Sequence, residues 1–225
     1  MGKYVIPSIS FDDPAFPDQY YWRGSIWGLT NYMVYHGLKR YQFDDVSFQF
    51  AQKSYDLFME DWRAHQHNNE QYLATGGAGK GDPHYTFGAL LPLLAIEEFI
   101  DMNPWDGLRF GILNPTTAGE FQGALWGKQR YNVVVGPQKT ALTRDGQLRF
   151  EAEGGVVVRQ YRPESSRLSF SLIANQSTSI HSLEFPSGEF QLKVDGKVVG
   201  KVKASGGRIR FEVQPGNHQI ELNQN

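Results

Sequence analysis

The chain contains no cysteine, which excludes disulfides and a cysteine nucleophile. Long hydrophobic runs are also absent: the longest, GALLPLLAI at 88–96, is well short of the roughly 18 residues that a membrane-spanning helix needs. The N-terminus, MGKYVIPSISFDDP, lacks the apolar core of a signal peptide. We therefore expect neither a membrane span nor a secretory signal. The compartment stays undetermined, with the cytoplasm slightly favoured.

The sequence has no excess of charge of either sign. Its 22 basic and 24 acidic residues give a formal net charge of -2, and no run of like charges occurs. Nucleic acids and anionic membranes usually require a basic patch, so neither is an expected partner. His65 and His67 are two residues apart with no recognisable third ligand, so we predict no metal site. The glycines at 76–81 lack the Gly-Lys-Ser/Thr ending of a phosphate-binding loop, and no cofactor is expected.

Aromatic residues are abundant, with 5 Trp, 11 Tyr and 15 Phe, and many lie in a first half that we expect to be helical, residues 1–105. One helix is predicted over 25–41 with Ser25 as its N-cap, and another is predicted from an apolar stripe at helical spacing. The members of that stripe are Phe48, Ala51, Tyr55, Phe58 and Trp62. A third helix, about 84–102, is apolar on nearly all sides, and Pro92 should kink or break it. Three such helices need a further packing surface.

The hydrophobic period changes to two after Pro104, which predicts short strands. Eight alternating stretches follow one another: YNVVVG, QLRFEAEG, GVVVRQY, RLSFSLIA, EFQLKVDG, KVVGKVKA, GRIRFEVQ and HQIELN. They are separated by glycine-containing turn signals at 145–146, 154–155, 195–196, 206–207 and 215–216. We predict an antiparallel β-sandwich domain over 106–225, which gives the chain an α+β, two-part organisation.

One carboxylate stands almost alone in the stretch HNNEQYLATGGAGKG, residues 67–81. Glu70 is surrounded there by amides and glycines, and only His65, His67 or Lys80 could neutralise it. A general base must be ionised and hydrogen-bonded to the group that it deprotonates, and close cations would compete for it. The alternative interpretation is a solvated loop residue or a cap.

Two stretches resemble a known family. YYWRGSIWGLTNYMVYHGLKRY, residues 20–41, is similar to the Tyr-Trp-Arg-Gly motif and inner helix of glycoside hydrolase family 63 and its trehalase-like relatives. NNEQYLATGGAGKGDPHYTFGALL, residues 68–91, resembles the loop that carries the catalytic base of these enzymes, followed by their last inner helix. The resemblance covers roughly residues 7–102. It implies part of an (α/α)6 toroid, in which inner helices surround a sugar pocket, with a β-sandwich as an accessory domain.

The resemblance also implies roles for individual residues. Glu70 falls on the general base of an inverting glycoside hydrolase, and Tyr21, Trp22 and Arg23 fall on the subsite around the bond that is cut, with Trp27 nearby. We further expect Tyr72 or Tyr85 to face the same carbohydrate pocket. The residues by themselves leave alternatives open: the rings at 21, 22 and 27 are also typical of a core, and Arg23 of an ion pair with a carboxylate.

The family's general acid is an aspartate upstream of the Tyr-Trp-Arg-Gly motif, and no residue of this chain takes that position. The resemblance therefore implies the C-terminal portion of an inverting glycoside hydrolase that acts on oligosaccharides or small glycosides, and a 225-residue chain that is inactive by itself. The missing part of the toroid, or a homo-oligomer, should cover the helices. The alternative is a non-catalytic carbohydrate-binding or structural module derived from such an enzyme.

Overall fold

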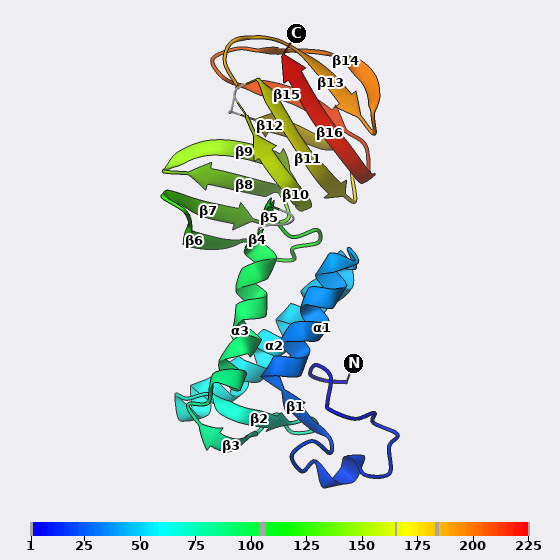
Figure 1. The fold of residues 1–225 in the computed structure, drawn as a ribbon, viewed down its shortest axis with the longest axis vertical. Coiled ribbons are helices and arrows are strands. Elements are labelled where there is room, and N and C mark those ends of the chain that lie inside the picture. The colour runs from blue at the N-terminus through cyan, green and yellow to red at the C-terminus, as the bar shows by residue number, and fades with distance from the viewer. Residues whose placement is uncertain (1, 104–106, 165, 183–184, 225) are drawn as a thin grey trace. The chain divides into compact units, whose positions relative to one another are not determined.

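The computed structural model describes residues 2–103, 107–164, 166–182 and 185–224 (Figure 1). The chain divides into two compact units, Met1–Glu97 and Glu98–Asn225. The boundary that the sequence placed between residues 105 and 106 lies outside the described residues. Among the described residues, three α-helices and large antiparallel sheets make up most of the fold, which confirms the α+β composition and the switch from helices to strands.

The first unit combines three helices with a small sheet of strand order β1-β2-β3. Its elements are η1 (Phe16–Asp18), β1 (Ser25–Trp27), α1 (Gly28–Arg40), α2 (Asp44–His65), β2 (Asn69–Leu73), β3 (Gly79–Pro83) and α3 (Thr86–Phe99), whose last residues pass the unit boundary. The core is a single cluster of buried aromatic and aliphatic side chains from the N-terminal segment before η1, from all three helices and from the sheet. It includes Tyr4, Ile26, Tyr35, Phe50, Leu57, Tyr72, Leu91 and Leu94.

The predicted start of the first helix is wrong. Ser25 does not cap a helix: it begins β1, which pairs with β2 through Ser25 opposite Leu73 and Trp27 opposite Gln71. The Ser25 hydroxyl donates to the Gln19 carbonyl at 3.2 Å. This pairing joins segments almost fifty residues apart, so a local periodicity cannot reveal it, and α1 begins only at Gly28.

The second helix is confirmed, but its buried face differs from the predicted stripe. α2 buries Ser47, Phe50, Ser54, Leu57 and Asp61, whereas Tyr55 is exposed. The Ser47 hydroxyl donates to the Asp44 carbonyl at 3.0 Å, and Asp61 accepts from the Asn69 side chain, whereas the buried Ser54 hydroxyl has no hydrogen-bond partner among the described residues. The spacing of the apolar residues therefore predicted a buried face of α2 that is shifted by about one residue from the observed one.

The third helix runs through Pro92 without a break, since α3 is helical over its full length. Leu91 and Leu94 are fully buried, while Leu93 and Ile96 are exposed. The apolar sequence of α3 suggested a helix that is buried on all sides. In this chain, part of its apolar surface is exposed. The helix ends earlier than predicted, because Ile100–Asn103 is strand β4.

The second unit consists of a seven-stranded sheet, order β14-β13-β16-β11-β10-β5-β4, and a six-stranded sheet, order β15-β12-β9-β8-β7-β6. The strands described in this unit pair in antiparallel orientation, and every one of the eight predicted stretches lies in a strand. The strands, besides β4, are β5 (Gly107–Phe110), β6 (Gly119–Trp126), β7 (Gln129–Val135), β8 (Lys139–Arg144), β9 (Gln147–Glu153), β10 (Val156–Pro163), β11 (Arg167–Ala174), β12 (Thr178–Ser182), β13 (Gly188–Val194), β14 (Lys197–Ala204), β15 (Ile209–Val213) and β16 (Gly216–Gln224).

The two sheets pack through a group of buried rings. Phe150 of the six-stranded sheet contacts Phe110, Tyr161 and Phe170 of the seven-stranded sheet, with centroids 5.2, 6.0 and 5.7 Å apart. These near-perpendicular pairs are the favoured arrangement of aromatic rings. Alternating strands that bury one face against a second sheet are the arrangement expected of an antiparallel sandwich.

Candidate functional site

The Tyr-Trp-Arg-Gly segment forms a tight turn that projects from the first unit. Two backbone hydrogen bonds close it, Arg23 to the Tyr20 carbonyl at 2.9 Å and Tyr20 to the Arg23 carbonyl at 3.1 Å. The Ser8 hydroxyl donates to the Trp22 carbonyl at 2.9 Å and accepts from the Gly24 N–H at 3.0 Å. Tyr21 has a φ of 52°, in the left-handed region that side chains other than glycine rarely adopt. Such strain persists only where surrounding contacts hold it, and it is common at functional sites.

The turn places Trp22 directly on Trp27. Their rings are stacked, with centroids 3.9 Å apart and planes 7° apart. Trp27 is 1% exposed and Trp22 is 43% exposed, so the inner indole belongs to the core and the outer one faces solvent. The Trp27 Nε1–H donates to the Tyr21 carbonyl at 3.2 Å, and the exposed Tyr21 ring meets Trp27 edge-on. A fixed, exposed aromatic surface results.

Tyr85 joins the same group of rings through Phe87. Phe87 lies edge-on to Tyr85 at 5.1 Å and approaches Trp27 at 6.3 Å. Tyr85, near the start of α3, is exposed. The structure thus brings together four of the predicted residues: Tyr21, Trp22, Trp27 and Tyr85. Phe87, which links them, was not selected from the sequence, because nothing in its local pattern distinguishes it from a core residue.

Glu70 lies on strand β2, not in a loop as the sequence suggested. Its neighbour Gln71 pairs with Trp27, so Glu70 sits beside the end of the strand that carries the inner indole. The carboxylate passes over the backbone of Gly81, where any Cβ would collide with it, and Gly81 has a φ of +74°. Only glycine satisfies both conditions, so the β2–β3 hairpin is shaped around the Glu70 side chain.

Within the described residues, no hydrogen bond or ion pair involves the half-buried Glu70 carboxylate. The cations that the sequence offered are engaged elsewhere or do not reach it: His65 pairs with Asp61 at 3.0 Å, and His67 contacts the rings of His65 and His84. A carboxylate without a cationic partner retains its lone pairs for a ligand or a water molecule.

Arg23 forms an ion pair with Asp18 at 3.4 Å and lies over the Tyr20 ring at 5.8 Å. Both charged side chains are largely exposed, so the pair contributes little to stability. Arg23 is not joined to Glu70 by any hydrogen bond or ion pair in the described part of the chain. A guanidinium has five N–H donors, and one ion pair leaves others for a ligand on the outer face of the turn.

Tyr72 belongs to the core. Its ring is 0% exposed, and its hydroxyl accepts from the Asn69 N–H at 3.2 Å. Burial raises the pKa of Tyr72 to about 12, and the charge of Asp61 contributes to the same direction. A fully covered ring offers no face to a sugar, so we assign Tyr72 to the support of β2 and not to ligand contact.

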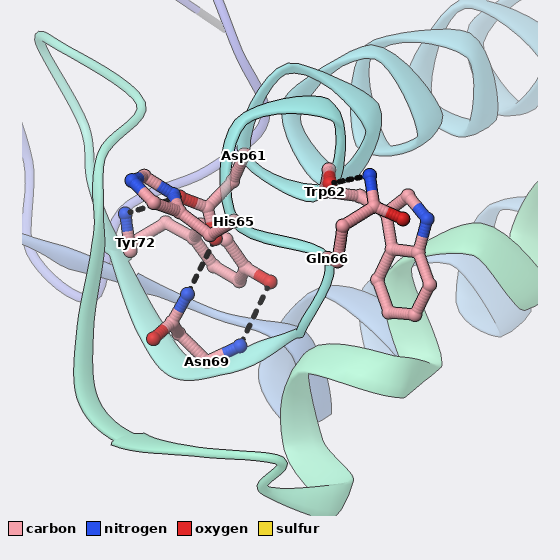
Figure 2. A network of polar contacts seen from close by, with 7 residues as sticks. Asp61, Trp62, His65, Gln66, Asn69 and Tyr72 are labelled. Atoms are coloured by element: carbon pink, nitrogen blue, oxygen red, sulfur yellow. Dashed lines mark hydrogen bonds and ion pairs between the residues drawn. The ribbon is translucent and has the colours of Figure 1, made fainter.

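A polar network beneath the hairpin was not foreseen from the sequence (Figure 2). Asp61, at the buried face of α2, accepts from the Asn69 side chain and from the Gly79 N–H at 3.3 Å, and pairs with His65. Asn69 directly precedes Glu70 on β2, while Gly79 begins β3. One carboxylate therefore ties both strands of the Glu70 hairpin to the helix. The only sequence signal was the i, i+4 spacing of Asp61 and His65.

Other site classes find no support in the described residues. They hold no group of three or more His, Asp or Glu side chains arranged for a metal ion. None of the described helices combines the length and the apolar character that a membrane crossing requires. The features that can act chemically in the first unit are an exposed aromatic surface, the exposed guanidinium of Arg23 and a carboxylate without a protein partner.

Comparison with known proteins identifies the class to which these features belong. Residues 1–88 match the family model of the mannosylglycerate hydrolase MGH1-like glycoside hydrolase domain. The first unit is therefore related to glycoside hydrolases of the trehalase-like kind, which confirms the resemblance seen in the sequence.

Three individual relatives are all named as mannosylglycerate hydrolases. Mannosylglycerate hydrolases MGH1 and MGH2 of Selaginella moellendorffii are each 43% identical over 54 residues, 24% of this chain and 11% of each relative. A mannosylglycerate hydrolase of Thermus thermophilus is 29% identical over 93 residues, 41% of this chain and 21% of the relative. The chain thus matches at most about a fifth of the length of these relatives.

Proposed function

We propose that the first unit is part of the catalytic (α/α)6 toroid of an inverting glycoside hydrolase, with a mannosylglycerate-like glycoside as substrate. The stack of exposed Trp22 on buried Trp27, beside the strand that carries Glu70, is the observation on which this proposal depends. The apolar face of a pyranose ring packs well on an indole that cannot turn away. The relatives named as mannosylglycerate hydrolases supply the substrate class.

Glu70 serves as the general base in this proposal. Its carboxylate accepts a proton from a water molecule while the water oxygen bonds to the anomeric carbon from the face opposite the leaving group. The bond between the anomeric carbon and the glycosidic oxygen breaks, and a second carboxyl group protonates that oxygen. Inversion requires the two carboxyl groups roughly 6.5 to 9.5 Å apart, so that a water molecule fits between one of them and the sugar.

The aromatic residues and Arg23 hold the substrate. Trp22, Tyr21 and Tyr85 present ring surfaces for the sugar, and the Arg23 guanidinium donates to hydroxyl or carboxylate oxygens. Asp61 keeps the hairpin, and with it Glu70, at a fixed distance from these rings. A base held by a buried network needs no reorganisation when the substrate arrives, which is a general requirement for efficient catalysis.

We assign the general acid to no residue of the 225, and we expect this chain to show no turnover by itself. A base without an acid cannot protonate the leaving oxygen of an unactivated glycoside. The acid would come from another part of the toroid, which would also cover the exposed apolar residues of α1 and α3, among them Met33 and Leu93. A homo-oligomer is the second way to cover these faces.

Titration of the chain with mannosylglycerate tests the proposal. We expect the indole N–H resonances of Trp22 and Trp27 to shift on addition of the glycoside, and Trp22→Ala to abolish the saturable shift of Trp27. Glu70→Gln should bind normally, because the amide keeps the shape of the carboxylate. Absence of any Trp22 shift, or an unchanged Trp27 shift in Trp22→Ala, contradicts the proposed binding surface.

The base role requires a complete active site. Residues 1–88 can replace the matching segment of the Thermus relative, and the chimera can be assayed for mannosylglycerate hydrolysis. Glu70→Gln in this chimera should lower kcat by about a hundredfold or more with little change in KM. Turnover that survives the substitution excludes the base role and leaves a carbohydrate-binding module derived from the enzyme as the better description.

A further inference from the structure

The second unit contains a cavity of about 410 Å³ that the proposed catalytic role does not use. Its lining includes three aromatic residues together with an amide, a guanidinium and smaller side chains. They are Leu108, Trp126, Gln129, Tyr131, Arg144 and Tyr161, with Gly127 and Pro163 at the edge. Pockets of this size, mostly apolar with a few polar groups, are typical of small-molecule sites. A second cavity of about 320 Å³ in the same unit has no aromatic lining.

The cavity lies between the two sheets. Leu108 and Tyr161 come from the seven-stranded sheet, where they are direct cross-strand partners on β5 and β10. Tyr131 and Arg144 face each other across β7 and β8 of the six-stranded sheet, and Trp126 pairs with Gln129 at the end of the β6–β7 hairpin. Because cross-strand partners share one face of a sheet, three such pairs converge on one space.

The strands around the cavity are irregular next to the residues that line it. β10 has a bulge between Arg159 and Arg162, where Gln160 adopts a φ of 54°, and Tyr161 follows immediately. β6 has a register shift at Gly123, and β8 has one between Leu142 and Thr143, just before Arg144. Bulges re-aim side chains and cluster at functional sites. The irregular strand positions therefore lie close to Trp126, Arg144 and Tyr161, which line the cavity.

The depth of the residues divides the cavity into a floor and a rim. Tyr131 and Tyr161 are buried and form the floor, while Trp126 is 41% exposed at the rim. The Tyr131 hydroxyl donates to the Gln129 side-chain carbonyl at 2.6 Å, which fixes the amide so that its NH₂ group remains a donor. Arg144 adds a guanidinium, whose five N–H groups can serve a ligand in addition to protein partners.

From this arrangement we infer that the second unit binds a hexopyranose-type saccharide in this cavity, at a site separate from the Trp22 surface. The exposed indole of Trp126 would pack on the apolar face of the sugar, and Gln129 and Arg144 would donate to its oxygens. An apolar ligand would leave the NH₂ group of Gln129 unpaired, which costs free energy. The described residues of the lining include no carboxylate, so they offer no charge that would repel an acidic sugar.

The indole N–H resonances of the ¹⁵N-labelled chain provide the test. Trp126→Phe identifies the Trp126 resonance by its loss. Methyl α-mannopyranoside, maltose and glucuronate are then added in turn, each to tens of millimolar. We expect at least one of them to shift the Trp126 resonance in a saturable way. Trp126→Ala should weaken this binding about fivefold to tenfold.

Leu125→Ala is the matched control, because Leu125 is exposed on the same hairpin but does not line the cavity. It should leave the affinity unchanged. The inference fails if none of the three sugars moves the Trp126 resonance, if only the Trp22 resonance moves, or if the two substitutions weaken binding equally. A shift at Trp126 that persists in Trp22→Ala shows in addition that the two sites are independent, so this result does not depend on the proposed catalytic function.

Discussion

Trp22 lies flat on Trp27, with the outer indole half exposed and the inner one completely enclosed. This pair connects the fold to the proposed function, because Trp27 is packed in the core and Trp22 stacks on it. The hydrogen bonds of Ser8 hold the turn in which Tyr21 has a positive φ, and this turn places Trp22 on Trp27. An exposed ring on a fixed base presents its face to a ligand with little loss of side-chain entropy on binding.

The two rings should therefore respond differently to substitution. Trp27→Ala removes a buried aromatic side chain and should destabilise the first unit by about 3–5 kcal/mol. Trp22→Ala removes a partly exposed ring and should cost about 1 kcal/mol, while it abolishes glycoside binding at the Trp22 surface. Urea unfolding followed by the helical circular-dichroism signal measures the first effect. Equal costs for the two substitutions would show that the outer ring is part of the core.

Gly81 should tolerate no side chain. Gly81→Ala places a Cβ against Glu70 at a φ of +74°, and the left-handed conformation alone should cost about 1–2 kcal/mol. The displaced carboxylate should also lower the activity of the chimera described above. Gly76→Ala is the control, since a Cβ there meets no atom within 4 Å and its φ is not positive. A Gly81→Ala variant as stable as Gly76→Ala would contradict the close approach of Glu70.

Asp61 should hold the hairpin that carries Glu70. Asp61→Ala leaves the Asn69 side chain and the Gly79 N–H without their acceptor, at about 1–3 kcal/mol for each buried group that stays unpaired. We expect faster hydrogen exchange at the Gly79 amide and a lower melting temperature. Asp56→Ala, at an exposed position of the same helix, should change neither. Unaltered exchange at Gly79 in Asp61→Ala would show that the network does not support the hairpin.

The pH dependence of stability should report on Tyr72. Because the folded-state pKa of Tyr72 is about 12 and the ordinary value is 10.0, its hydroxyl stays protonated in the folded chain after it ionises in the unfolded chain. The unfolded state then binds fewer protons, so stability is fully present below pH 10 and falls as the pH rises towards 12. Two pKa units correspond to at most about 2.7 kcal/mol. Melts of the wild type and Tyr72→Phe between these pH values should diverge, and parallel curves would contradict the shift.

The strand-rich half was predictable because its signals are local. Alternation in stretches such as RLSFSLIA, and turns such as Asp145-Gly146, depend on neighbours in sequence, and all eight stretches lie in strands. β1 was missed because its partner β2 lies almost fifty residues further along the chain, whereas β2 and β3 form a local hairpin whose glycine-rich sequence lacks the alternation of a strand. The burial of Asp61 on α2 was missed because its partners, the Asn69 side chain and the Gly79 N–H, belong to the β2–β3 hairpin and not to the helix.

The candidate site could be predicted only in part from the sequence. The resemblance located the rings at 21, 22 and 27 and the carboxylate of Glu70, and the structure places three of these rings in contact. It also led us to include Tyr72, whose hydroxyl turns inward to the Asn69 backbone. Sequence spacing cannot distinguish these outcomes, because the register of β2 against β3 shifts between Asn69 and Gln71, so the alternation of a regular strand does not apply there. Asp61 and Phe87 act through contacts that appear only after folding.

The exposed apolar side chains of the first unit lead to a last prediction. Met33 on α1 is 66% exposed, and Tyr41 at its end is 77% exposed, with Phe43 and Val46 also uncovered. Large apolar patches on a protein surface usually bind a partner. If the 225-residue chain is produced alone, a second copy is the available cover, and a symmetric dimer is the commonest result. Light scattering should then detect a species larger than 25.5 kDa. Met33→Glu combined with Tyr41→Glu should restore the monomer, whereas Leu125→Glu in the second unit should not. A wild-type chain that stays monomeric at high concentration would exclude the oligomer and leave further toroid helices as the proposed cover.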